Sequence, residues 1–105
     1  MKTYDLYGYS YDSDLDVARQ AVESLLNIQM NKHESLYHCG DYYRLGKDGA
    51  ENFILQLNHD DFEDEWTEEE HKDYPLVLYV NETSRAEDIE RKLTEKFKLL
   101  RREEL

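Results

Sequence analysis

The sequence has little of what cross-links a chain or anchors it in a membrane. It contains one cysteine, Cys39, so no disulfide can form within the chain, which is compatible with a reducing compartment. No apolar run approaches the length that spans a bilayer, and residues 1–14 lack the apolar core of a secretory signal. We therefore expect a cytoplasmic protein without a membrane partner.

Proline and glycine are also rare, with one and four copies. The single proline, Pro75, marks the point where a polar segment returns to regular structure. No internal repeat or low-complexity linker divides the 105 residues. We therefore expect one domain, residues 1–105, with one core, and a monomer when the protein is free.

Positively charged residues are also few relative to negatively charged ones. The chain has 13 lysines and arginines against 25 aspartates and glutamates, for a net charge of −12. This balance argues against nucleic acid as a partner, because lysine and arginine supply the affinity for phosphates. It also argues against an anionic membrane surface. A cationic or basic protein partner is favoured instead.

Most of the net charge lies in one stretch, residues 59–73 (HDDFEDEWTEEEHKD), which we call the acidic segment. Its only formal positive charge is Lys72. Its nine acids are Asp60, Asp61, Glu63, Asp64, Glu65, Glu68, Glu69, Glu70 and Asp73. Two large aromatics, Phe62 and Trp66, lie among them, although such side chains usually seek burial.

Two interpretations of the acidic segment remain open at this point. In the first, it is a surface lobe that presents carboxylates to a basic partner, with an aromatic anchor among them. In the second, it is a mobile acidic loop whose aromatics pack against the core. Composition alone does not separate these two possibilities.

Apolar spacing predicts the elements on either side of the acidic segment. We expect strands over residues 2–9, 52–58 and 76–80. Residues 31–43 are expected to form two strands or one bent strand, with Gly40 as a bend or bulge. The run at 76–80 (LVLYV) is nearly all apolar, which places it centrally in the sheet. A helix is expected over residues 13–29, with Ser13 and Asp16 at its start.

A second helix is expected from Ser84, which forms a capping box with Glu87. Its buried stripe is predicted to be Ala86, Ile89, Leu93, Phe97 and Leu100. Six basic residues near its C-terminal end would suit the helix dipole: Arg91, Lys92, Lys96, Lys98, Arg101 and Arg102. The resulting fold class is α+β, a single mixed or antiparallel sheet of four to five strands with two helices packed on it.

The sequence gives little support for a metal site or a catalytic site. The acids do not fit a calcium-binding EF-hand loop, because the sixth and twelfth positions are wrong in both registers, starting at Asp60 or at Asp61. The histidines and Cys39 lack the spacing of zinc ligands, and a Cys39–histidine nucleophile pair has no support beyond residue types. We therefore expect no catalytic residue, no metal and no cofactor. Tyrosine, in contrast, has nine copies and is typical of recognition surfaces.

Three segments cover most of the chain: DLDVARQAVESLL, then ESLYHCGDYYRLG with FILQLNHD behind it, then YPLVLYVNETSRAEDIERKL. In pattern and layout they resemble the small cytosolic immunity proteins of bacterial polymorphic-toxin systems, including contact-dependent growth inhibition. The resemblance implies a binding protein, not an enzyme. Its implied partner is one cognate toxin domain, often a basic nuclease, that it binds tightly and inactivates.

The negative net charge of the chain is consistent with a nuclease as the partner, because a nuclease presents a positive surface to its substrate. The expected toxin-binding residues are Asp60, Asp61, Phe62, Glu63, Asp64, Glu65, Trp66, Glu68, Glu69, Tyr42 and Tyr43. The alternative hypothesis is a small metal-dependent enzyme or regulator that uses the acidic segment and the histidines.

Overall fold

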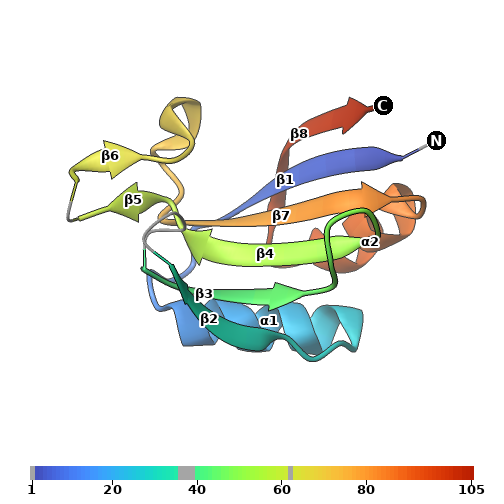
Figure 1. Ribbon diagram of the computed structural model, residues 1–105, viewed down its shortest axis with the longest axis horizontal. Helices are drawn as coiled ribbons and strands as arrows, with labels where there is room; N and C mark the ends of the chain where they lie inside the picture. The colour runs from blue at the N-terminus through green and yellow to red at the C-terminus, as the bar shows by residue number, and fades with distance from the viewer. Residues whose placement is uncertain (1, 36–39, 62) are drawn as a thin grey trace.

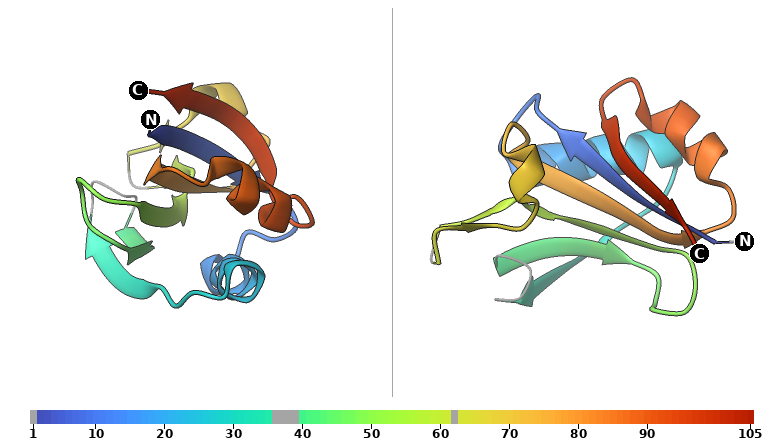
Figure 2. Two further views of the ribbon diagram at one scale, coloured as in Figure 1. Left: turned by 90° about the vertical axis from the view of Figure 1, so that its right-hand side faces the viewer. Right: turned by 90° about the horizontal axis from the view of Figure 1, so that it is seen from above.

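The computed structural model describes residues 2–35, 40–61 and 63–105, which form a curved antiparallel sheet with two helices on one face (Figure 1, Figure 2). The six-stranded sheet has the order β2-β3-β4-β7-β1-β8. Its strands are β1 (Thr3–Tyr9), β2 (Asn31–Ser35), β3 (Gly40–Leu45), β4 (Asn52–Leu57), β7 (Leu76–Thr83) and β8 (Lys98–Glu104). The helices are α1 (Leu15–Leu26) and α2 (Ala86–Leu93). The α+β class is confirmed, but the sheet has six strands instead of four to five.

Strand β7 lies at the centre of the sheet, between β4 and β1, as its apolar sequence predicted. Alternate side chains, including Leu78 and Val80, face the helices and join the main core. Val77 faces the opposite side, which we call the outer face, and is also fully buried. A strand buried on both faces reads as a continuous apolar run, which accounts for the sequence LVLYV.

Helix α1 matches the predicted helix, although it is shorter at both ends. Its N-cap is Asp14, whose carboxylate accepts a hydrogen bond from the Asp16 backbone N–H at 2.8 Å, so the expected cap at Ser13 is wrong. Asn27 ends the helix in the left-handed conformation, with φ of 55°. Asparagine tolerates this conformation better than most residues, which explains the early end.

The C-terminal region differs most from expectation, because α2 stops at Leu93 and the chain then forms strand β8. Leu100, Arg101 and Arg102 therefore lie on a strand, not on a helix. Without β8, one side of β1 would be an unpaired sheet edge, and pairing β8 there satisfies its backbone groups.

The start of α2 also differs from expectation. The Ser84 capping box is absent, because the N-cap residue is Arg85 and no side chain caps the helix. The Arg85 N–H donates to the Thr83 hydroxyl. The part of the predicted stripe that lies on the helix is correct for Ile89 and Leu93, which are fully buried, whereas Ala86 is only partly buried.

A buried ion pair fastens β8 to the core side of the sheet. The Arg102 guanidinium donates to both carboxylate oxygens of Asp5 at 2.9 Å, and it also contacts Glu90 of α2 at 2.9 Å. The Asp5 side chain is fully buried, and the Tyr7 hydroxyl donates to it. Burial and the nearby Asp5 charge raise the pKa of the Tyr7 phenol, which therefore stays neutral and able to donate.

The antiparallel pair β2–β3 shows that residues 31–43 contribute two strands. Gly40 opens β3 with φ of +100°, a conformation that favours glycine. Cys39, which precedes Gly40, and the aromatic Phe62 lie outside the described residues. Within the part of the chain that is described, neither helix has the length and apolar character needed to cross a bilayer.

Candidate functional site: the acidic hairpin

The acidic segment contains regular structure that its composition did not indicate. Strands β5 (His59–Asp60) and β6 (Glu65–Trp66) pair as a short antiparallel hairpin, which we call the acidic hairpin. A single turn of 3₁₀ helix, η2 (Glu69–His71), follows it. Figure 1 shows the hairpin projecting from the end of the sheet opposite the two chain termini. The acidic segment is therefore a folded projection.

Asn58 holds the base of this projection. Its side chain is fully buried, and its amide NH₂ donates to the carbonyl oxygens of His71 and Tyr74, both at 2.9 Å. Its amide oxygen accepts from the Glu68 N–H at 2.8 Å. The Asn58 backbone adds bonds to Thr67 and Pro75. One residue thus joins both ends of the acidic segment to strand β4.

Replacing Asn58 by alanine is expected to lower the free energy of unfolding by about 2–3 kcal/mol, because three side-chain hydrogen bonds of roughly 1 kcal/mol each are lost in a buried site. Urea denaturation measures this loss, and hydrogen exchange should show faster exchange in residues 67–75. The isosteric variant Asn58→Asp is the control for volume. It should be at least as destabilising, since a carboxylate would face two carbonyl oxygens. A stable Asn58→Asp variant would contradict the assigned role of the amide.

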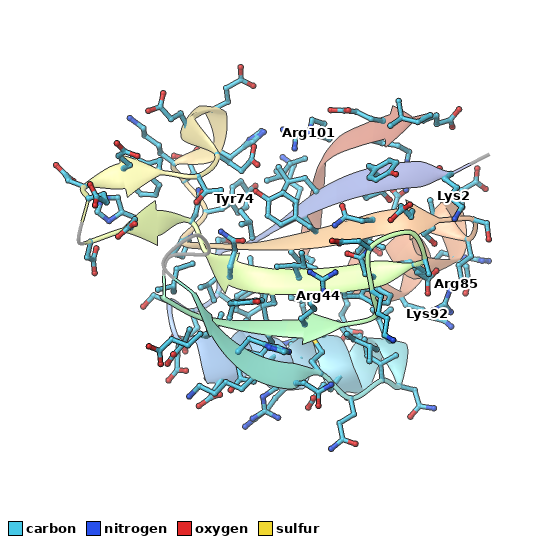
Figure 3. The ribbon with its side chains drawn as sticks, viewed as in Figure 1. Lys2, Arg44, Tyr74, Arg85, Lys92 and Arg101 are labelled. Carbon is cyan, nitrogen blue, oxygen red and sulfur yellow. The ribbon has the colours of Figure 1, made fainter. Side chains whose placement is uncertain are left out.

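A second anchor connects the segment to the outer face of the sheet. The Glu68 carboxylate accepts hydrogen bonds from the Tyr79 hydroxyl of β7 and from Arg101 of β8, the latter at 3.0 Å. Tyr74 covers Gly8 so closely that a Cβ there would lie 2.5 Å from its ring. Figure 3 shows Tyr74 and Arg101 where the acidic segment meets the sheet. Glu68 is thus an anchor, and its carboxylate is not available to a partner in this arrangement.

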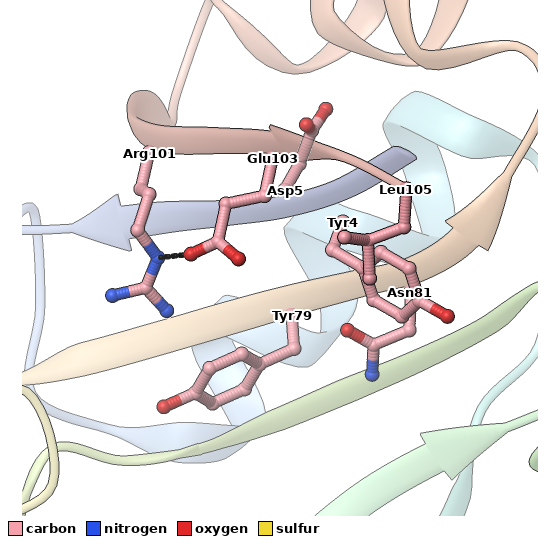
Figure 4. Close-up of a pocket in the computed structure, with 7 residues that line it drawn as sticks. All are labelled: Tyr4, Asp5, Tyr79, Asn81, Arg101, Glu103 and Leu105. Atoms are coloured by element: carbon pink, nitrogen blue, oxygen red, sulfur yellow. Dashed lines mark ion pairs between the residues drawn. The ribbon is translucent and has the colours of Figure 1, made fainter. Parts of the chain in front are cut away.

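Arg101 also borders a hollow of about 220 Å³ on the outer face, shown in Figure 4. Tyr4, Tyr79 and Asn81 form its walls, and Glu103 pairs with Arg101 at 3.3 Å. Two carboxylates, Glu68 and Glu103, therefore already neutralise the guanidinium beside the hollow. This pairing argues against an anion-binding site there.

The turn of the hairpin is organised around His59. Its Nδ1 lies 2.7 Å from the Asp61 carboxylate and its Nε2 lies 3.0 Å from the Asp64 carboxylate. The ring also packs against Trp66, with 4.7 Å between centroids. Hydrogen bonds to Asp61 and Asp64 raise the pKa of His59, while partial burial opposes this shift. Trp66 is half-buried, so the hairpin itself accounts for part of its burial.

Most carboxylates of the acidic segment point into solvent. The exposed acids are Asp61, Glu63, Asp64, Glu65, Glu69, Glu70 and Asp73, whereas Asp60 and Glu68 are partly buried. Asp60 accepts from the Glu63 N–H at 3.3 Å. The projection therefore carries a dense negative surface in which only some charges serve the local fold.

The two tyrosines expected at the site lie on opposite faces of β3. Tyr42 is half-buried on the outer face, stacked on His33, and lies opposite Gln56. The Gln56 amide donates to the Thr67 hydroxyl at the hairpin base, so Tyr42 is near the projection. Tyr43 is buried on the core side and donates to Asp16 of α1. The structure therefore brings Tyr42, but not Tyr43, toward the acidic hairpin.

Sequence reasoning missed the residues that position the hairpin: Asn58, Tyr79 and Arg101. Each is an ordinary residue type within a strand or next to one, and its partners are 10–33 positions away. The only sequence signal is Asn58 itself, a polar residue that directly follows an apolar strand and precedes the charged run. Long-range pairings of this kind become visible only after the sheet order is known.

Among residues 2–35, 40–61 and 63–105, no three histidine, cysteine, aspartate or glutamate side chains are arranged to hold a metal ion. The cysteine and His38 lie outside these ranges. No protein-family model matches the chain, and no curated protein matches it significantly.

Proposed function

We propose that the protein binds and neutralises a cognate toxin domain with a basic surface, such as a nuclease, through the acidic hairpin. The observation that carries the proposal is the projection itself. It is a set of exposed carboxylates on a segment that extends beyond the sheet and is fixed to it at two anchors. Asn58 and Glu68 provide these anchors. A preformed projection loses less conformational entropy on binding than a flexible loop would.

The charge of the projection suits fast capture of a basic partner. Exposed like charges close together create a local field that steers an oppositely charged protein and raises the association rate. A high association rate favours neutralisation, because a toxin must be bound before it acts on its target. The exposed acids of the hairpin and η2 would meet the surface that the nuclease otherwise presents to phosphates.

The main test is to neutralise four exposed glutamates whose side chains have no partner in the described part of the chain: Glu63, Glu65, Glu69 and Glu70, each changed to Gln. We expect association with the toxin domain to be about tenfold slower at low salt, with a smaller difference at high salt because screening removes long-range steering. Surface plasmon resonance at two salt concentrations measures both rates. The first step is to determine whether a toxin-encoding frame lies immediately upstream, and the product of such a frame is then co-expressed with this protein to test neutralisation.

A matched control changes four exposed glutamates elsewhere, Glu34, Glu87, Glu95 and Glu104, to Gln. This control has the same net charge as the hairpin variant, so any difference between the two reports the position of the charge. Equal association rates for both variants would show that total charge, and not the hairpin, governs capture. An unchanged rate in the hairpin variant at low salt would refute the hairpin as the toxin-facing surface.

Trp66 adds a second readout in the same experiment. If the exposed part of its ring enters the interface, Trp66→Ala should speed dissociation by about 30-fold or more, equivalent to roughly 2 kcal/mol, with little salt dependence. A lower melting temperature with unchanged dissociation would instead assign Trp66 to hairpin packing alone.

A further inference from the structure

The arrangement of His59 within the acidic hairpin requires a particular protonation state. Both ring nitrogens lie within hydrogen-bond distance of carboxylate oxygens, those of Asp61 and Asp64. An ionised carboxylate only accepts hydrogen bonds, so both nitrogens must donate. A neutral imidazole has one donor and one acceptor, whereas the imidazolium has two donors. The geometry of the turn therefore fits a doubly protonated His59 better than a neutral one.

One further contact and one backbone feature accompany the imidazolium. The indole of Trp66 lies 4.7 Å from the imidazole ring, within the range of a cation–π interaction. Asp64 adopts a left-handed backbone conformation, with φ of 52°, which costs energy for a residue with a Cβ. This conformation lies in the same turn as the contact between its carboxylate and the imidazolium. Opposite charges thus hold the turn closed.

We propose that the acidic hairpin is a proton-dependent element: it is closed around the His59 imidazolium and loosens when His59 loses its proton. Deprotonation leaves one ring nitrogen as an acceptor facing a carboxylate, and this contact becomes repulsive. Within the described residues, Asp61 and Asp64 of the turn are the charged groups that act on the ring. Trp66 of β6, which packs against the ring, is not titratable.

The sign of the pH dependence follows from the direction of the shift. The contacts with Asp61 and Asp64 raise the pKa of His59 above its ordinary value of about 6.5. The closed turn is therefore complete below about pH 6.5 and is lost as the pH rises through the higher folded-state pKa. The effect remains local, because the Asp61 and Asp64 side chains are 95% and 93% exposed and water screens such pairs. Global unfolding is consequently a poor readout.

The single tryptophan provides a local readout, since all tryptophan fluorescence of the free protein comes from Trp66. A protonated imidazole in contact with indole quenches its emission. We expect the intensity to increase with pH in a single transition with a midpoint above about 6.5. The variant His59→Gln should lack this transition. A midpoint at or below 6.5 in the wild-type protein would overturn the proposal.

Two conservative variants test the role of the carboxylates. Asp61→Asn and Asp64→Asn remove one negative charge each, and asparagine tolerates the left-handed conformation at position 64. Each should move the fluorescence midpoint to lower pH. The control Glu63→Gln removes the same charge from the same turn without a contact to the ring, so its shift should be smaller. Equal shifts in all three variants would mean that general charge, and not the two contacts, sets the protonation of His59.

These measurements use the free protein, so they do not depend on the proposed partner. Added salt provides one more check. Screening should lower the pH midpoint of the fluorescence transition of the wild-type protein toward 6.5, while the protein stays folded. A midpoint that is insensitive to salt would also contradict an electrostatic closure at this exposed site.

Discussion

Replacing Arg102 by alanine is expected to lower the free energy of unfolding by about 3 kcal/mol, measured by urea denaturation. The variant leaves the carboxylate of Asp5 without its charged partner, although the Asp5 side chain is fully buried. Breaking a buried ion pair by removing one partner costs roughly 3–5 kcal/mol. The lower end of this range applies because the Arg102 side chain is 25% exposed, so water can partly enter its place.

Two further variants separate the buried pair from a general effect of arginine removal. Arg91→Ala removes an exposed arginine that pairs with Asp88 on the surface of α2, and we expect a change within about 0.5 kcal/mol. Asp5→Asn should cost less than Arg102→Ala, since the guanidinium left behind can still reach water and Glu90. If Arg102→Ala and Arg91→Ala cost the same, the pair does not fasten β8 to the sheet.

The second large effect is expected in the apolar core. Leu78 of β7 and Leu93 of α2 are both fully buried in the cluster between the sheet and the helices. Truncating either residue to alanine should cost about 2–5 kcal/mol, because the lost transfer free energy is increased by a cavity that the core cannot close. Urea denaturation provides the measurement for both variants.

Val17→Ala is the control for this prediction, because Val17 lies on the exposed side of α1. Alanine has the higher helix propensity, so we expect this variant to be neutral or slightly stabilising. A loss below about 0.5 kcal/mol for both Leu78→Ala and Leu93→Ala would show that the helices and the sheet do not share this core.

The sequence was most informative where one physical signal dominated. The apolar run at residues 76–80 specified a strand buried on both faces. The helical spacing within residues 13–29 specified α1, in which Ala18 and Val22 are fully buried. The C-terminal strand was not predictable in the same way. Leu93, Phe97 and Leu100 continue the helical spacing, so local periodicity favoured a longer α2. The pairing of β8 with β1, about 100 residues away in the chain, outweighed that preference.

The same limit applies to the candidate site. Charge identified the acidic segment, because nine carboxylates in fifteen residues are apparent from composition. Composition did not separate Glu68, which binds Tyr79 and Arg101, from its exposed neighbours Glu69 and Glu70. That distinction depends on which strands lie beneath the segment, and sheet order is set by non-local contacts that no short window of sequence contains.

The hydrogen bonds of Asn58 at the base of the acidic segment have a consequence for which parts of the sequence can vary. The backbone bonds of Asn58 to Thr67 and Pro75 close the segment at its base. The described residues of the range 59–66 pair in a separate two-stranded sheet and not in the main sheet. Changes in length between two fixed ends cost little, since the closure entropy of a loop rises only slowly with its length. If the proposed function holds, substitutions and insertions within residues 59–66 would alter which toxin domain is bound while the scaffold stays the same. Related chains that share this scaffold should differ most in these positions.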